Sequence, residues 1–89
     1  MNAPLKHPKI PEIVHIVLSQ ADRHRRAGLI SEEFFEGQVR RLTREELEPR
    51  CLTLLIRELS DGRTRFLIKR TDSGQVCDMF ETDSLASAA

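Results

Sequence analysis

The nine residues Ala27-Gly28-Leu29-Ile30-Ser31-Glu32-Glu33-Phe34-Phe35 decide the first half of the fold. Gly28 favours the left-handed backbone that ends a helix, and Ser31 is a preferred N-cap residue. The two glutamates that follow suit the positive end of a helix dipole. Ile30 and Phe35 have the spacing of a hydrophobic staple across the helix start. The stretch therefore predicts two helices that are joined by a tight turn and are neighbours in an αα-hairpin.

The segments on either side of this turn both have helical periodicity. Pro11 suits a first helical turn, and the apolar residues that follow recur along one stripe up to Arg26. This helix ends in the basic cluster Arg23-His24-Arg25-Arg26, where cations favour the negative end of the dipole. The second helix should run from Ser31 to about Leu42. We expect each helix to bury one apolar face.

The succession Gly-Leu-Ile-Ser-Glu-Glu-Phe-Phe-Glu at 28–36, between a polar helix and a basic-apolar helix that ends in Leu42, resembles the prokaryotic SHOCT motif. The resemblance covers about residues 19–42. It implies a compact two-helix packing unit, which in larger proteins assists oligomerisation or partner binding. The chain departs from the motif in two respects. The motif usually closes a chain, whereas a further structured segment follows it here, and Phe34 stands where glutamate is usual.

The next segment has two interpretations, of which the first is a third helix at about 46–59. Thr43 and Glu46 have the spacing of a capping box, and Pro49 then falls in the first turn of the helix or at a kink. The run Cys51–Leu59 is rich in leucine, which favours helix over strand. We prefer this interpretation.

The alternative makes 51–59 a strand that turns at Asp61-Gly62, a favoured hairpin dipeptide, into Thr64–Arg70. Such a strand would lie at the edge of a meander with apolar side chains on both faces. It would therefore need cover on both sides, and a partner subunit is the means by which the strand interpretation would hold.

The last part of the domain is predicted as an antiparallel β-hairpin. Segments 65–70 and 76–81 flank Asp72-Ser73-Gly74, which fits a three-residue loop with glycine in the left-handed position. The register pairs Phe66 with Phe80, Leu67 with Met79 and Arg65 with Glu81. The face formed by Phe66, Ile68, Val76 and Phe80 should pack on the helices, unless the sheet extends across a dimer.

Together these elements predict an α+β fold with an N-terminal αα-hairpin, a third helix or alternatively a strand at about 46–59, and a C-terminal antiparallel β-hairpin. Residues 10–81 should form a single small domain. The proline-containing residues 1–9 are expected to be a flexible arm, and 82–89 a disordered tail.

The composition limits the class of protein. The 89 residues include 14 basic and 14 acidic side chains, which cancel, and no Trp or Tyr. One apolar core is only marginally sufficient at this size, so we expect a homodimer. Cys51 and Cys77 are too few for a disulfide framework and are interpreted as reduced packing residues. With neither a signal peptide nor an apolar run that would span a membrane, the chain is predicted to be cytoplasmic.

The sequence contains no pattern that indicates catalysis or ligand chemistry. His7, His15 and His24 lack the i, i+4 spacing of a helical metal site, and neither cysteine belongs to a Cys-x-x-Cys pair. A Gly-x-Ser-x-Gly turn and a glycine-rich phosphate loop are both missing. We therefore predict that the protein is not an enzyme and has no metal or cofactor.

The sequence thus predicts a small protein-binding module that acts as a homodimer. An adaptor, a regulator or an inhibitor, of bacterial or phage origin, fits equally well. The predicted partner-facing charges, for an acidic partner, are Arg23, Arg25, Arg26, Arg40 and Arg41. The alternative is a nucleic-acid-binding regulator that uses the basic rim of the helical hairpin. The zero net charge and the acidic start of the second helix argue against this alternative.

Overall fold

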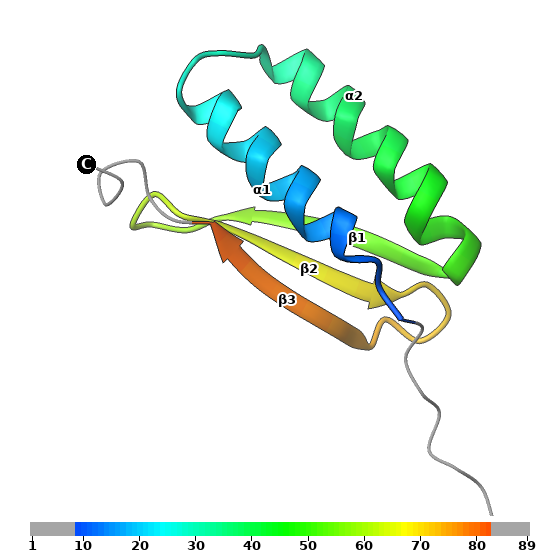
Figure 1. Ribbon diagram of the computed structural model, residues 1–89. Coiled ribbons are helices and arrows are strands. Elements are labelled where there is room, and N and C mark those ends of the chain that lie inside the picture. The colour runs from blue at the N-terminus through cyan, green and yellow to red at the C-terminus, as the bar shows by residue number, and fades with distance from the viewer. Residues whose placement is uncertain (1–8, 83–89) are drawn as a thin grey trace, which may run out of the picture.

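Two helices cover one face of a three-stranded antiparallel sheet in the computed structural model, which describes residues 9–82 (Figure 1). The elements are α1 (Glu12–Arg26), α2 (Glu32–Leu42), β1 (Leu52–Glu58), β2 (Thr64–Arg70) and β3 (Val76–Thr82), and the strand order is β1-β2-β3. The predicted α+β class and helical hairpin are confirmed. The arm and the tail expected at the two ends lie almost wholly outside the described residues.

The turn between the helices is built as its sequence predicts. Gly28 has a φ of +77°, and the Leu29 N–H donates to the His24 carbonyl at 2.8 Å, which closes α1. The Ser31 hydroxyl oxygen accepts a hydrogen bond of 3.0 Å from the Phe34 N–H and caps α2. The helical hairpin is therefore specified by short-range contacts.

The capping box expected at Thr43 does not form. Helical backbone continues from α2 through a π-helical turn at Thr43–Leu47 and a 3-10 turn at Glu48–Arg50. The Thr43 hydroxyl donates to the Val39 carbonyl at 2.8 Å and so supports the preceding helix. The helical path ends at Cys51, whose φ of +59° turns the chain towards the sheet. The expectation of a packed Cys51 was wrong, because this side chain is exposed at the turn.

The segment after Cys51 is a strand, so the preferred helix at 46–59 was wrong and its alternative was right. β1 pairs with β2 along its whole length, from Leu52 opposite Arg70 to Glu58 opposite Thr64. Leu52 is buried, and other apolar side chains of β1 pack on the core from the same face. Pairing with β2 and cover by the helices outweigh the helical propensity of leucine, because strand preference depends on the neighbours of a side chain.

The register of the hairpin β2–β3 is confirmed, with Phe66 opposite Phe80, Leu67 opposite Met79 and Arg65 opposite Glu81. Two details differ from the prediction. A register shift between Ile68 and Lys69 displaces Val76, which is 48% exposed instead of packed on the helices. In addition, β3 continues through Thr82, one residue beyond the expected domain boundary, because Thr82 is buried against α1.

The core lies between the helical layer and the sheet. Its buried members are Val14, Leu18, Leu42, Leu47, Leu52, Phe66 and Ile68. Phe66 stacks on Phe80 with ring centroids 5.0 Å apart, and the His15 ring of α1 lies 4.2 Å from Phe80. The hydrophobic layer therefore extends from α1 across β3 to the central strand.

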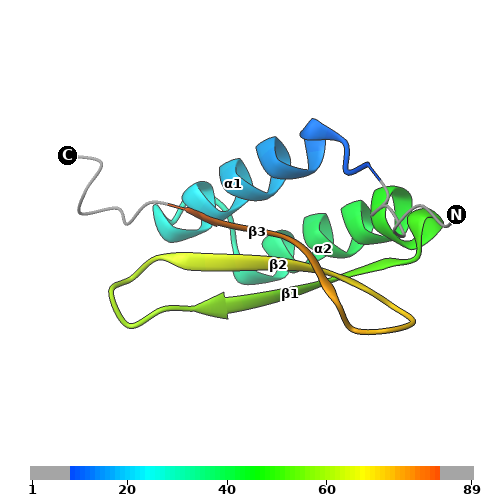
Figure 2. The same ribbon diagram turned by 90° about the horizontal axis from the view of Figure 1, so that it is seen from below.

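No helix of residues 9–82 lies over the opposite face of the sheet, as the view from below in Figure 2 shows. Leu55, Leu67 and Met79 form an apolar row across the three strands on that face, since each is the paired neighbour of the next. Met79 is 50% exposed, whereas the two leucines are half-buried. Among the described residues, one sheet face and the outer side of the helical layer are thus not covered by another element.

Candidate protein-interaction site

The five arginines predicted to face a partner lie at two ends of the helical layer. Arg23, Arg25 and Arg26 occupy the last turn of α1, whereas Arg40 and Arg41 occupy the last turn of α2. The two helices run antiparallel in the hairpin (Figure 1). Given a rise of 1.5 Å per residue, the length of α2 separates the two groups by about 16 Å. The structure therefore does not bring the five residues together.

Arg25 and Arg26 have partners inside the fold. The Asp22 carboxylate is fully buried, and Arg25 Nη2 lies 2.6 Å from its Oδ1 atom. The hydroxyl groups of Thr64 and Thr82 donate to the same carboxylate at 3.1 and 2.6 Å. Arg26 Nε lies 3.6 Å from Asp22 Oδ2. Three side chains from α1, β2 and β3 thus donate hydrogen bonds to one buried carboxylate, as its burial requires, and Arg26 adds a positive charge nearby.

The guanidinium of Arg25 has a second contact, over the Phe35 ring, with 4.3 Å between its central carbon and the ring centroid. Burial alone would lower the pKa of Arg25, but the hydrogen bond and charge of Asp22 outweigh burial, so that the pKa lies above its ordinary value. Arg26 donates to the Gly62 carbonyl in the β1–β2 loop. Arg25 Nη1 also lies 3.5 Å from Glu58 Oε1 of β1, so both arginines join the helical layer to the sheet or to its first loop.

Sequence reasoning missed this buried cluster although a signal for it exists. Asp22 follows the buried residues Val14 and Leu18 by eight and four positions, which places it on the inner stripe of α1. A carboxylate on an apolar stripe needs polar partners, and Arg25 lies one turn later on the same side. The spacing alone would have assigned Arg25 to the interior of the fold.

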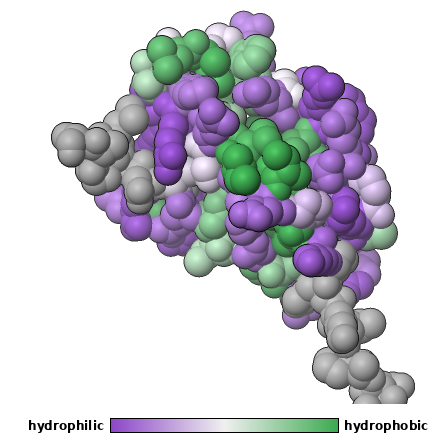
Figure 3. All heavy atoms as spheres, viewed as in Figure 1, coloured by the Kyte–Doolittle hydropathy of each residue, from purple (hydrophilic) through white to green (hydrophobic). Residues whose placement is uncertain are grey.

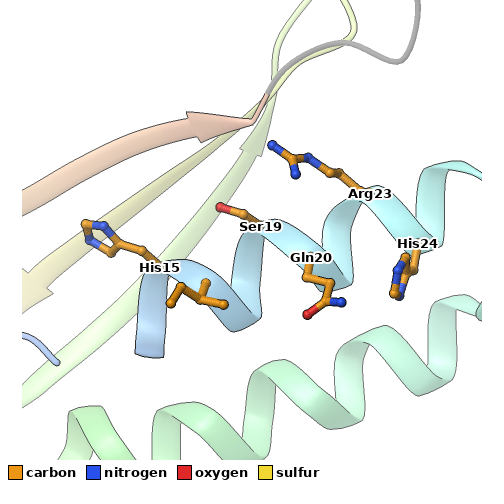
Figure 4. Close-up of a pocket in the computed structure, with 6 residues that line it drawn as sticks. His15, Ser19, Gln20, Arg23 and His24 are labelled. Carbon is orange, nitrogen blue, oxygen red and sulfur yellow. The ribbon is translucent and has the colours of Figure 1, made fainter. Parts of the chain in front are cut away.

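Arg23 differs from Arg25 and Arg26 because its side chain is exposed. It lies on the outer side of α1, along a shallow hollow that His15, Ser19 and His24 also line (Figure 4). His15 points towards the sheet, where its Nε2 atom lies 2.6 Å from Asp78 Oδ2. All the described residues that line this hollow belong to one helix. The hollow is therefore one side of α1, joined to β3 by the contact between His15 and Asp78, and its shape does not enclose a ligand.

The outer face of α2 has a more complete set of features for a protein contact. Glu33, Phe34, Gly37, Gln38 and Arg41 line a hollow there, and their spacing places them on one face of the helix. Phe34 is 55% exposed, and a side chain added at Gly37 would meet no atom within 4 Å. The exposed Phe34 ring thus lies on the same helix face as a glycine that has open space beside it.

Figure 3 shows hydrophobic patches on the surface of the helical layer. One patch covers the turn before α2 and the start of α2, where Leu29 and Phe34 are exposed. The other covers the N-terminal half of α1, where Ile13 and Ile16 are exposed. The two patches flank the surface between the helices and would add apolar area to a contact made by α2.

The charges on α2 are divided along its length. The acidic side chains all come before Gly37 in the sequence, and the basic ones come after it. The acidic residues are Glu32, Glu33 and Glu36, and the basic residues are Arg40 and Arg41. Arg41 Nε lies 3.2 Å from Glu45 Oε2, but both side chains are more than half exposed. Such a surface pair is weak and can be exchanged for a contact with a partner.

Within residues 9–82, no three His, Cys, Asp or Glu side chains are placed so that they could hold a metal ion. None of the helices in the same range combines the length and apolar character that crossing a membrane requires. Comparison of the chain with models of protein families, with curated proteins and with solved structures gives no match. The resemblance to the SHOCT motif at 19–42 therefore stays a prediction.

Proposed function

We propose that this chain is a non-enzymatic protein-binding module that acts as a homodimer, in which α2 packs antiparallel on α2 of a second copy. The observation that carries the proposal is the arrangement of charge on the exposed face of α2. Glutamates occupy its first half and arginines its second half, with Gly37 between them. A helix with this pattern is complementary to itself when it is turned end to end.

The symmetry defines which residues meet. We place the two-fold axis beside Gly37. A residue that precedes Gly37 by a given number of positions then lies opposite the residue that follows Gly37 by the same number in the second copy. Glu33 then meets the partner's Arg41, and the same pair forms again on the other side of the axis. Phe34 lies level with the partner's Arg40, where a cation can contact an aromatic face. The antiparallel arrangement also opposes the two helix dipoles favourably.

The shape of α2 supports the same arrangement. A glycine inside a helix costs about 1 kcal/mol relative to alanine, and no atom of the described residues occupies the space beside Gly37. Without a Cβ atom, this position allows a second helix to approach closely. The two glycines then face each other, and each exposed Phe34 covers one side of the space beside them. Aromatic anchors in such hollows usually carry much of the binding energy of an interface.

Charge reversal in a mixing experiment tests this function. Arg41→Glu and Glu33→Arg each create two like-charge contacts in the symmetric pair, so each variant alone should sediment as a monomer. An equimolar mixture of the two should form a heterodimer, because both contacts regain opposite charges. Sedimentation velocity at several concentrations measures the result.

Arg23→Glu is the matched control, since it makes the same charge change on an exposed site of α1. It should leave the dimer intact. Circular dichroism melts of all variants check that the fold is kept. A wild-type chain that stays monomeric at high concentration, or a mixture that stays monomeric, would overturn the proposal.

Nucleic-acid binding is less well supported by the geometry. The basic rim that it requires is divided between two ends of the helical layer, and Arg25 and Arg26 have partners in the fold. The start of α2, which a DNA-reading helix would present to base edges, is acidic. Fluorescence anisotropy with labelled duplex and single-stranded oligonucleotides at low salt should show no binding. Salt-dependent binding that Arg41→Glu removes would favour this alternative.

A further inference from the structure

A second surface that is suited to a protein contact lies at the edge of the sheet. β1 is an edge strand, and no segment of residues 9–82 pairs with its outer side. We infer that this edge receives an extended, acidic segment of a partner protein as a fourth strand. The inference rests on the proposed function as a protein-binding module, but it concerns a different surface from the α2 face.

The hydrogen bonds at the two ends of β1 show which backbone groups are free. The Thr71 N–H donates to the Cys51 carbonyl at 2.9 Å, and the Leu59 N–H donates to the Arg63 carbonyl at 2.8 Å. Between these bonds the register with β2 is unbroken. Since hydrogen-bonded and non-bonded pairs alternate in an antiparallel ladder, the odd-numbered residues of β1 bond to β2. The backbone N–H and carbonyl groups of Leu54 and Ile56 therefore point away from β2, in the plane of the sheet, towards the open edge of β1.

The other edge of the sheet is protected, and the difference favours β1. The register shift between Ile68 and Lys69 makes β3 irregular, and His15 of α1 contacts Asp78 of β3. Such irregularities and charges usually prevent edge pairing. β1 has a regular register over seven residues and contains neither proline nor lysine. Within residues 9–82, β1 thus offers the more continuous template for an added strand.

The side chains of β1 define what the added strand should carry on each face. Leu54 and Ile56 are half-buried and pack against the core, so the inner side chains of the added strand should be apolar. On the outer face, Arg57 is exposed and lies directly opposite Arg65. Glu81 lies 2.7 Å from Arg65, whereas no acidic residue pairs with Arg57 in β1 or β2. A carboxylate beside Arg57 would relieve this like-charge pair.

This charge pattern distinguishes the acidic segment from a second copy of β1. In an antiparallel β1–β1 pair centred on Leu55, the outer neighbour of Arg57 would be the partner's Thr53. On the sheet face that points away from the helices, β1 carries Thr53, Leu55 and Arg57, so a second copy of β1 supplies no carboxylate there. A second copy can satisfy the backbone groups of the edge but not the charge of Arg57.

Three synthetic peptides with blocked ends test the inference on the full-length protein. The first is Val-Glu-Val-Glu-Val-Glu-Val, the second replaces each glutamate with lysine, and the third is the acidic peptide with an N-methyl group on every backbone amide. The acidic peptide should shift the amide signals of Leu54 and Ile56 in NMR spectra and slow their hydrogen exchange. The lysine peptide should bind about tenfold more weakly, and the N-methylated peptide should not bind in either orientation on the edge.

Arg57→Glu makes the charge argument testable without disturbing the backbone edge, because this side chain is exposed. The variant should prefer the lysine peptide. Equal binding of the acidic and lysine peptides to the wild type, or unchanged binding of the N-methylated peptide, would overturn the inference. Slow exchange of Leu54 and Ile56 in the protein alone at high concentration would also overturn it, since the edge would then belong to a second copy.

The result can be separated from that for the homodimer. Arg41→Glu should remove the α2 contact and leave β1 unchanged, so the monomeric variant should still bind the acidic peptide. A variant that no longer dimerises but still binds the acidic peptide would support the edge assignment. A dimeric protein that binds none of the peptides would overturn the edge assignment and leave the α2 proposal intact.

Discussion

The hydroxyl of Thr82, at the end of β3, donates a hydrogen bond of 2.6 Å to the Asp22 carboxylate of α1, and both residues are buried. The bond joins positions that are 60 residues apart in the sequence. Thr64 of β2 donates to the same carboxylate, and Arg25 supplies the opposite charge. The first helix is thereby fixed to the central strand and to the last strand by one buried acceptor.

Replacing Thr82 with valine should test the weight of this hydrogen bond. Thr82→Val keeps the shape of the side chain but leaves Asp22 with one donor fewer, and we expect the free energy of unfolding to fall by about 1–3 kcal/mol. Thr82→Ser retains the hydroxyl and is the control, with a smaller loss. Urea denaturation measures both. A serine variant that is as unstable as the valine variant would show that the methyl group matters more than the bond.

Charge reversal at Arg25 should have a different effect from charge reversal at Arg23. Arg25→Glu places a second carboxylate beside buried Asp22 and should destabilise the fold by about 3 kcal/mol or more. Arg23 is exposed and its charge faces only the end of the α1 dipole, so Arg23→Glu should lower the unfolding free energy by no more than about 1 kcal/mol. Thermal or urea denaturation distinguishes the two. Equal effects of the two substitutions would mean that the Asp22 cluster contributes little.

Gly37 should separate the stability of the monomer from the formation of the dimer. Gly37→Ala introduces no clash in the monomer and should stabilise it by about 1 kcal/mol, when measured at low protein concentration. Gly37→Leu should fill the hollow on α2 and prevent close approach of a second helix. Sedimentation velocity should therefore find this variant monomeric while its fold is kept. A Gly37→Leu variant that dimerises as tightly as the wild type would contradict the proposed helix contact.

The two β-turn aspartates should give the protein a stability term that depends on pH. The pKa of Asp61 is lowered chiefly by the hydrogen bond from the Arg63 backbone N–H, and the pKa of Asp72 by its hydrogen bond with Arg70. Because these pKa values are depressed in the folded state, the unfolded chain binds more protons in acid. The stabilisation is thus present above the ordinary pKa of 3.8 and is lost as the pH falls through the lower folded values.

The Asp61→Asn, Asp72→Asn double variant tests this dependence. Its unfolding free energy should fall less than that of the wild type when the pH is lowered from about 6 to about 2. Denaturant unfolding at a series of pH values gives the comparison. Identical slopes for the two proteins would show that these turns contribute nothing to acid sensitivity.

Local signals in the sequence were sufficient for the helical hairpin and for the β2–β3 register. The Gly28 turn and the Ser31 cap depend on backbone geometry and hydrogen bonds within a few residues, so they can be predicted without knowledge of the rest of the fold. The pairing of Phe66 with Phe80 was also predicted, but the register shift between Ile68 and Lys69 separates it from the loop that contains Gly74, so the cross-strand pairs and not the loop alone support it. The charge division on α2 is also visible in the sequence.

The identity of β1 and the roles of the arginines were decided by the tertiary structure. The segment Leu52–Glu58 has helical propensity, and only its pairing with β2 under the helical layer makes it a strand. Two capped helices and one hairpin could be predicted without the tertiary structure, because their signals act within a few residues. The burial of Asp22 depends on the packing of β2 and β3 against α1. Arg25 and Arg26 turn inwards towards this carboxylate, whereas Arg23 stays exposed. The tertiary structure decides this because a buried charge must take its partners from the elements that surround it.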